Sequence, residues 1–78
     1  MNIPFEDLLS HYLKSKYNII TPIKKVYNPT PSDPEKYFKF TFVYNNITNI
    51  FYTFGQNQTL QERQIDVLVN QNYPELFL

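Results

Sequence analysis

Between residues 38 and 44, every second residue of the chain is aromatic. The aromatic residues are Phe38, Phe40, Phe42 and Tyr44, and the positions around and between them hold Tyr37, Lys39, Thr41 and Val43. Successive side chains of a β-strand point to opposite faces of a sheet, so this period of two predicts a strand with one aromatic face. We expect helices to cover the aromatic face, and the face with Tyr37, Lys39, Thr41 and Val43 to meet solvent or a partner.

A first amphipathic helix is predicted near the N-terminus. Its apolar residues recur at positions i, i+3, i+4, i+7 and i+8 and are Phe5, Leu8, Leu9, Tyr12 and Leu13. Pro4 suits the first turn of this helix. Glu6 and Asp7 favour its N-terminal end, where the helix dipole is positive.

A second helix is predicted towards the C-terminus. Thr59 and Glu62 have the spacing of a capping box that opens this helix. Pro74 ends or kinks it. The residues of its buried stripe are Ile65, Leu68 and Val69.

Two further strands flank the aromatic one. The segment 19–27 is rich in β-branched and aromatic residues, and Pro22 within it favours an edge strand or a strand start. The segment 28–34 contains three prolines and is predicted to be a loop. Asn45 and Asn46 tolerate positive φ and indicate a turn, after which a strand runs through Ile50 to Phe54.

The expected fold is therefore α+β, in the order α-β-β-β-α. Three antiparallel strands would form one layer, and the two helices would form a second layer on one face of the sheet. We expect residues 1–78 to form a single domain. Its predicted core contains Phe5, Leu9, Phe40, Phe42, Ile65 and Leu68.

Composition excludes several classes of function. The 78 residues include seven basic and seven acidic side chains and no cysteine, so there is no net charge to attract a polyanion and no disulfide framework. No signal peptide or membrane-spanning run is visible, and we expect a soluble, intracellular protein without membrane contact. With one histidine and no Gly-rich phosphate loop, nothing supports catalysis, a metal or a cofactor.

The order of these motifs resembles the double-stranded RNA-binding domain family. The first helix of that family carries a Leu-Leu pair and then an aromatic residue, and a proline enters its first strand. The matching residues are Leu8, Leu9, Tyr12 and Pro22. Its first hairpin has Gly-Pro-x-His with a core Phe four residues after the His, where this chain has Asp33-Pro34-Glu35-Lys36 and Phe40. Before the second helix the family has Gly-x-Gly-x-Ser-Lys-Lys, then an acidic residue, Ala and Lys, which we match to residues 55–64.

The chain departs from this family at the residues that hold RNA. Lys36 replaces the His, and Leu60, Gln61 and Gln64 replace the three lysines that bind phosphates across the major groove. Since such contacts supply most of the affinity for duplex RNA, the resemblance implies weak binding. The remaining RNA contacts that it implies are His11, Lys36 and Arg63.

The third predicted strand is the expected partner surface. Its residues 48–54 include no charge and no proline, although edge strands are usually guarded by such residues. In dimerising members of the resembling family this strand pairs with its copy, so we expect a homodimer or a strand-adding partner. Alternatively, Leu76-Phe77-Leu78 folds back over the strand. The predicted interface residues are Ile50, Phe51, Tyr52 and Phe54, and Phe51 is also expected on the free sheet face with Tyr37 and Val43.

The function predicted from these features is a non-catalytic domain that acts mainly through protein contact, by dimerisation or by docking to an RNA-processing enzyme. One alternative is a weak, shape-specific binder of double-stranded RNA. A second alternative, from a different class, is a small phage or viral inhibitor that blocks a host enzyme.

Overall fold

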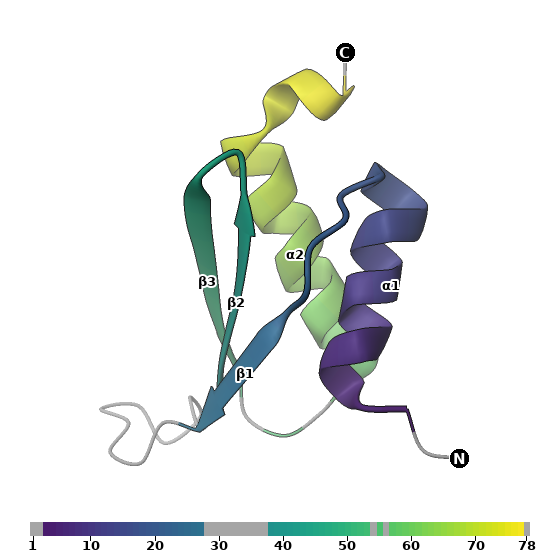
Figure 1. The fold of residues 1–78 in the computed structure, drawn as a ribbon, viewed down its shortest axis with the longest axis vertical. Coiled ribbons are helices and arrows are strands. Elements are labelled where there is room, and N and C mark those ends of the chain that lie inside the picture. Colours follow the sequence, from purple (N-terminus) through teal and green to yellow (C-terminus); the bar gives the residue numbers. More distant parts are fainter. Residues whose placement is uncertain (1–2, 28–37, 54, 56, 78) are drawn as a thin grey trace.

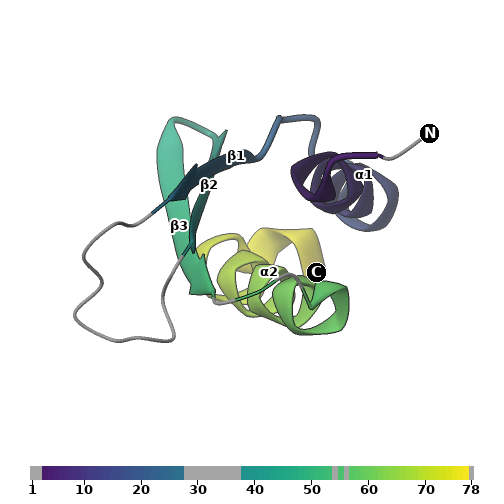
Figure 2. The same cartoon turned by 90° about the horizontal axis from the view of Figure 1, so that it is seen from below.

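The computed structural model describes residues 3–27, 38–53, 55 and 57–77 and has the predicted order of elements (Figure 1). Helix α1 spans Phe5–Tyr17, and helix α2 spans Gln58–Asn72. Between them lie β1 (Lys24–Tyr27), β2 (Phe38–Tyr44) and β3 (Ile47–Thr53), and a 3-10 helix, η1 (Pro74–Phe77), follows α2. The strands form one antiparallel sheet in the order β1-β2-β3. Both helices lie on the same face of this sheet (Figure 2), so the predicted two-layer α+β fold is confirmed.

Helix α1 is capped by backbone groups at both ends. Pro4 is the N-cap rather than a first-turn residue, and its carbonyl accepts hydrogen bonds from the amides of Asp7 and Leu8. At the other end Asn18 adopts a left-handed conformation with φ 58°, which is readily available to Asn. The amide of Asn18 donates to the carbonyl of Lys14, the single bond of an αL cap, and the amide of Ile19 reaches back to the carbonyl of Leu13 as the chain leaves the helix.

The β2-β3 hairpin is closed by a two-residue turn. Asn45 and Asn46 both have positive φ, 53° and 63°, as the tight turns that match the twist of antiparallel strands require. The register places Phe40 opposite Phe51 and Phe42 opposite Asn49. Residues that are directly opposite share a face of the sheet, so the hairpin directs all four side chains towards the helices.

The core lies between this face of the sheet and the two helices. The rings of Phe40 and Phe51 stack with centroids 5.4 Å apart, and Phe5 meets Phe40 edge to face at 5.9 Å. The predicted core is confirmed, with Phe5 and Leu68 partly buried at its margin. Its fully or almost fully buried apolar residues are Leu9, Leu13, Ile19, Ile23, Phe40, Phe42, Phe51, Ile65, Val69 and Tyr73.

Two boundaries differ from those predicted. Strand β1 begins at Lys24 and not near Ile19, because Ile19 and Ile23 are held in the core, where the amide of Ile23 donates to Ser10 Oγ. The predicted capping box is wrong, because α2 starts at Gln58 and its N-cap is Asn57. The Asn57 side chain accepts a 3.1 Å hydrogen bond from the amide of Leu60.

A buried polar network attaches the end of α2 to the hairpin. Asn49 donates to the hydroxyl of Tyr73 at 2.8 Å, and Tyr73 donates in turn to the carbonyl of Tyr44 at 2.9 Å. The Asn72 amide completes the network with a 2.7 Å hydrogen bond to Asn49 Oδ1. Since buried polar groups are costly unless they are hydrogen-bonded, this network specifies how α2 lies beside β3.

Candidate functional site

The two edges of the sheet differ in how well their residues prevent pairing with a strand of another chain. The edge formed by β1 carries Lys24 and Lys25 and follows Pro22, all of which discourage pairing with another strand. Strand β3, at the opposite edge, has the sequence ITNIFYT, with no charge and no proline. The predicted edge position of β3 is therefore confirmed, and its sequence lacks the usual protection.

The hairpin register determines which backbone groups of β3 face outwards. In a two-residue hairpin the residues that flank the turn, Tyr44 and Ile47, exchange their backbone hydrogen bonds. Backbone groups alternate along the strand, so those of Asn49 and Phe51 also point towards β2. The amide and carbonyl groups of Thr48 and Ile50 therefore point away from the sheet, in the orientation that another strand would need.

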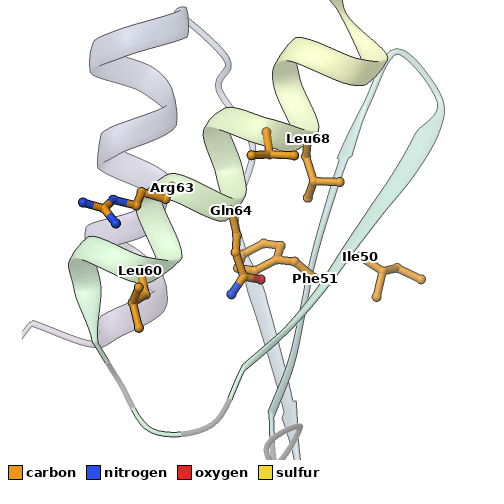
Figure 3. A pocket seen from close by; sticks show the side chains of 7 residues that line it. Ile50, Phe51, Leu60, Arg63, Gln64 and Leu68 are labelled. Carbon is orange, nitrogen blue, oxygen red and sulfur yellow. The ribbon is translucent and has the colours of Figure 1, made fainter.

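An apolar groove of about 450 Å³ runs beside this edge, between β3 and α2 (Figure 3). Leu60 and Val67 lie about two turns apart on α2. They are 45% and 53% exposed, and Ile50 on β3 is 40% exposed. Among the described residues that line the groove, Arg63 is the only charged one. Its lining residues are Ile50, Phe51, Leu60, Arg63, Gln64, Val67 and Leu68. A groove with this lining can bind an apolar segment but has no acid–base pair for chemistry.

The predicted interface residues do not share one surface. Ile50 and Tyr52 lie on the outer face of β3 and are about two-fifths exposed. The prediction that Phe51 lies on the free face is wrong: it is 4% exposed and stacks on Phe40 inside the core. Phe54 lies outside the described residues, as does Tyr37. The structure instead adds Leu60 and Val67 to the candidate interface. Their spacing with Gln64 places the three residues on one face of a helix, and this was the sequence signal from which they could have been found.

The predicted RNA contacts are not brought together. His11 lies on α1 and lines a groove with Lys14 and Pro22 on the β1 side of the molecule, where its Nε2 is 3.2 Å from Ser15 Oγ. Arg63 lies on α2 and lines the groove on the β3 side. Lys36 lies outside the described residues. The two described residues therefore belong to separate flanks of the fold.

The position at which α2 starts also changes which residues are matched to the three lysines of the double-stranded RNA-binding motif. Gln61 is fully buried, so it cannot occupy a position from which a lysine would reach phosphate. If the N-cap Asn57 is matched to the serine of the motif, Gln61 takes the place of the alanine, a small residue that suits a buried site. The three lysines then correspond to Gln58, Thr59 and Glu62. These positions are exposed or half-buried and include no basic residue.

A polar cluster joins the two helices on the side of α2 away from β3. The carboxylate of Asp66 accepts hydrogen bonds from the hydroxyls of Tyr12, at 2.8 and 2.9 Å, and Tyr17, at 2.6 Å. Lys16 forms an ion pair with the same carboxylate at 3.1 Å. Burial, together with the hydrogen bond to Asp66, raises the pKa of Tyr17 to about 12. Burial acts to raise the pKa of Asp66 too, but the bonds from Tyr17, Tyr12 and Lys16 outweigh it and lower that pKa.

Metal and membrane sites find no support in the described part of the chain. Among the residues described, no three His, Cys, Asp or Glu side chains lie close enough together to hold a metal ion. Neither α1 nor α2 is long and apolar enough to cross a membrane. The chain matches no protein-family model, no curated protein and no solved structure.

Proposed function

We propose that this domain is a non-catalytic protein-interaction module that associates with a second copy of itself through β3. The observation that carries the proposal is the unprotected β3 edge beside an apolar groove, at the opposite side of the sheet from a lysine-protected edge. An edge strand with outward backbone groups can pair with another strand, and exposed apolar residues beside it favour such contact.

A second copy fits this edge by symmetry. Two β3 strands in antiparallel orientation can pair about a two-fold axis at Ile50, whose outward amide and carbonyl would meet those of Ile50 in the other copy. The two sheets would then continue as one, and both α2 helices would lie on the same face of the combined sheet, one on each side of the seam. Leu60 lies near one end of the groove and Val67 near the other. Because the two α2 helices would run in opposite directions, Leu60 of one copy would lie across the axis from Val67 of the other.

Charge favours a closed dimer over a fibre. Strand β3 carries no charge, so two copies meet there without repulsion. Pairing of β3 with β1 of another copy would propagate into an open filament. Lys24 and Lys25 on β1, together with Pro22, oppose that arrangement. The protected edge thus restricts association to the pairing of β3 with β3.

The test is the mass of the protein in solution, measured by light scattering or sedimentation at several concentrations. The wild-type chain is expected to approach twice its chain mass of 9.4 kDa at high micromolar concentration. Ile50→Lys places a charge at the proposed axis and should give a monomer. Phe51→Lys would be a poor choice, because Phe51 is in the core and the variant would lose stability rather than association alone.

Val43→Lys is the matched control for Ile50→Lys. Val43 lies on the outer face of the central strand and is 52% exposed, so the variant adds the same charge to the same face away from the edge. It should remain dimeric. Circular dichroism of both variants checks that each is folded. A wild-type chain that stays monomeric throughout the concentration range would exclude self-association through β3.

The resemblance to double-stranded RNA-binding domains supports a second candidate, weak binding of duplex RNA. The order α-β-β-β-α agrees with it. This candidate ranks lower, because the positions that match the family's lysines lack basic residues under either alignment of α2 and the groove beside β3 is apolar.

A further inference from the structure

The outer face of the sheet is left uncovered by every described element, because both helices lie on the opposite face (Figure 2). The register arranges its side chains in rows across the strands. One row is Val26, Lys39 and Tyr52, and the next is Lys24, Thr41 and Ile50. Val43 and Thr48 form a third row, beyond the start of β1. Val26, Val43, Ile50 and Tyr52 are each 40–52% exposed, which makes this a broad, partly apolar surface.

A depression marks one end of this face. Since β1 begins only at Lys24, none of the described strands lies beside Val43 on the β1 side, and the connection through Thr21 and Pro22 borders the gap. The resulting cavity has a volume of about 450 Å³. Its lining residues are Thr21, Pro22, Lys24, Thr41, Phe42, Val43 and Thr48. Its apolar and threonine side chains suit an aliphatic or aromatic side chain of a partner, and Lys24 lies at its rim.

Charge on the outer face has a single sign. Lys24 and Lys39 are the charged residues among the described side chains of this face. They lie diagonally across β1 and β2, where such neighbours are about 7 to 8 Å apart. Val43 on β2 and Ile50 on β3 lie on a parallel diagonal on the other side of Thr41, so a cationic diagonal and an apolar diagonal run side by side across the face.

We propose that the outer face docks an amphipathic helix that carries acidic residues along one flank. Carboxylates at positions i and i+4 of a helix are about 6 Å apart, close enough to meet Lys24 and Lys39 together. The apolar flank of the same helix would cover Ile50 and Val43 and place one side chain in the depression. A second copy of this chain is a poor occupant for this face, because its lysines would meet lysines.

Protein is favoured here over single-stranded nucleic acid. Proteins that bind single strands stack the bases on several aromatic side chains along a basic groove. On this face Tyr52 is the one aromatic side chain among the described residues, and the other exposed apolar residues are Val26, Val43 and Ile50. Aliphatic side chains pack well against other aliphatic side chains but offer no ring on which a base can stack.

The test uses two stapled helical peptides of about 14 residues, long enough to cross the sheet at about 1.5 Å per residue. One carries leucines on one flank and glutamates at i, i+4 spacing beside them, and the other replaces each glutamate by lysine. Titration of the full chain followed by NMR should shift the amide signals of Thr41, Val43 and Thr48 with the acidic peptide. The acidic peptide should bind at least about tenfold more tightly than the basic one, since two charge pairs change from attraction to repulsion.

Charge reversal provides the decisive variant. K24E combined with K39E should invert the preference, so that the basic peptide binds more tightly than the acidic one. K14E changes an exposed lysine on α1, on the other layer, and should leave the preference unchanged. An acidic peptide that shifts no outer-face signal at millimolar concentration would overturn the proposal. So would an unaltered preference in the double variant, or a single-stranded RNA of about ten nucleotides that shifts these signals when the peptide does not.

Discussion

Tyr17 connects three elements through one side chain. Its hydroxyl donates a 2.6 Å hydrogen bond to Asp66, which lies 49 residues further along the chain on α2. Its ring meets Phe77 of η1 edge to face, with centroids 5.8 Å apart. The C-terminal segment as far as Phe77 therefore lies against the end of α1, and the alternative in which it covers the β3 edge is wrong for the described residues. The described residues leave the groove beside β3 open, while α2 is held to α1 on its other side.

Removal of the Asp66 carboxylate should loosen α2. We expect Asp66→Asn to lower the free energy of unfolding by about 1 to 2 kcal/mol at pH 7, a value kept small because the side chain is 34% exposed. The pKa of Asp66 is lower in the folded chain than its ordinary value of 3.8, so its contribution is complete above about pH 4 and is lost as the pH falls through the folded value. Urea titrations from pH 7 to pH 2 should show the two proteins converging in acid. Glu75→Gln, an exposed change in η1, is the control and should leave the free energy of unfolding at pH 7 unchanged.

The N-cap of α2 distinguishes the observed helix start from the predicted one. Asn57→Ala should cost about 1 kcal/mol of stability, because the amide of Leu60 loses its side-chain acceptor. Thr59→Ala should cost only a few tenths of a kcal/mol, since Thr59 is an exposed residue of the first turn. Thermal or urea unfolding of the two variants measures the difference. If Thr59→Ala lowered the free energy of unfolding more than Asn57→Ala, the predicted capping box of Thr59 and Glu62 would be correct after all.

The elements could be predicted from the sequence because their signals are local. The period of two in β2 and the 3.6-residue period in α1 depend only on neighbouring residues, and both elements formed as expected. The start of α2 was mistaken because two capping residues lie two positions apart. The first of them, Asn57, opens the helix, because its side chain accepts a hydrogen bond from the amide of Leu60.

The site was harder to predict, because it depends on tertiary placement. The face of Phe51 follows from the two-residue turn, which sets Phe51 opposite Phe40, so the sequence did contain that signal. The burial of Gln61 could not be foreseen, since an amide side chain is usually exposed. Nor does any local pattern show that Leu60 and Val67 lie beside β3. That arrangement results from the angle at which α2 crosses the sheet.

Phe40 is the residue whose loss should be most damaging. Phe40→Ala is expected to cost about 3 to 5 kcal/mol, enough to unfold much of a domain this small, because the ring contacts both Phe5 and Phe51. Tyr52→Ala removes a ring of similar size from the outer face and should cost about 1 kcal/mol or less. Thermal unfolding followed by circular dichroism compares them. Equal transitions for Phe40→Ala and the wild type would refute the assignment of the core.

Binding of duplex RNA should be weak and should respond to lysines placed on the first turns of α2. The wild-type chain is expected to bind a duplex of about 16 base pairs poorly at physiological salt, since its α2 start offers no cation there. The triple variant Gln58→Lys, Thr59→Lys and Glu62→Lys should raise the affinity and steepen its dependence on salt. Gln61→Lys should instead destabilise the fold, because it would bury a charge in the core.

A charge-matched control separates placement from net charge. Asn70→Lys, Gln71→Lys and Glu75→Lys make the same change in charge at exposed positions in the last turn of α2 and in η1. Fluorescence anisotropy at two salt concentrations measures both variants and the wild type on the same duplex. If lysines at the start of α2 meet phosphates across a groove, the first variant gains more affinity than the control. Equal gains would mean that general attraction to a polyanion explains the binding, and nanomolar binding by the wild type would show that the domain holds RNA by other residues.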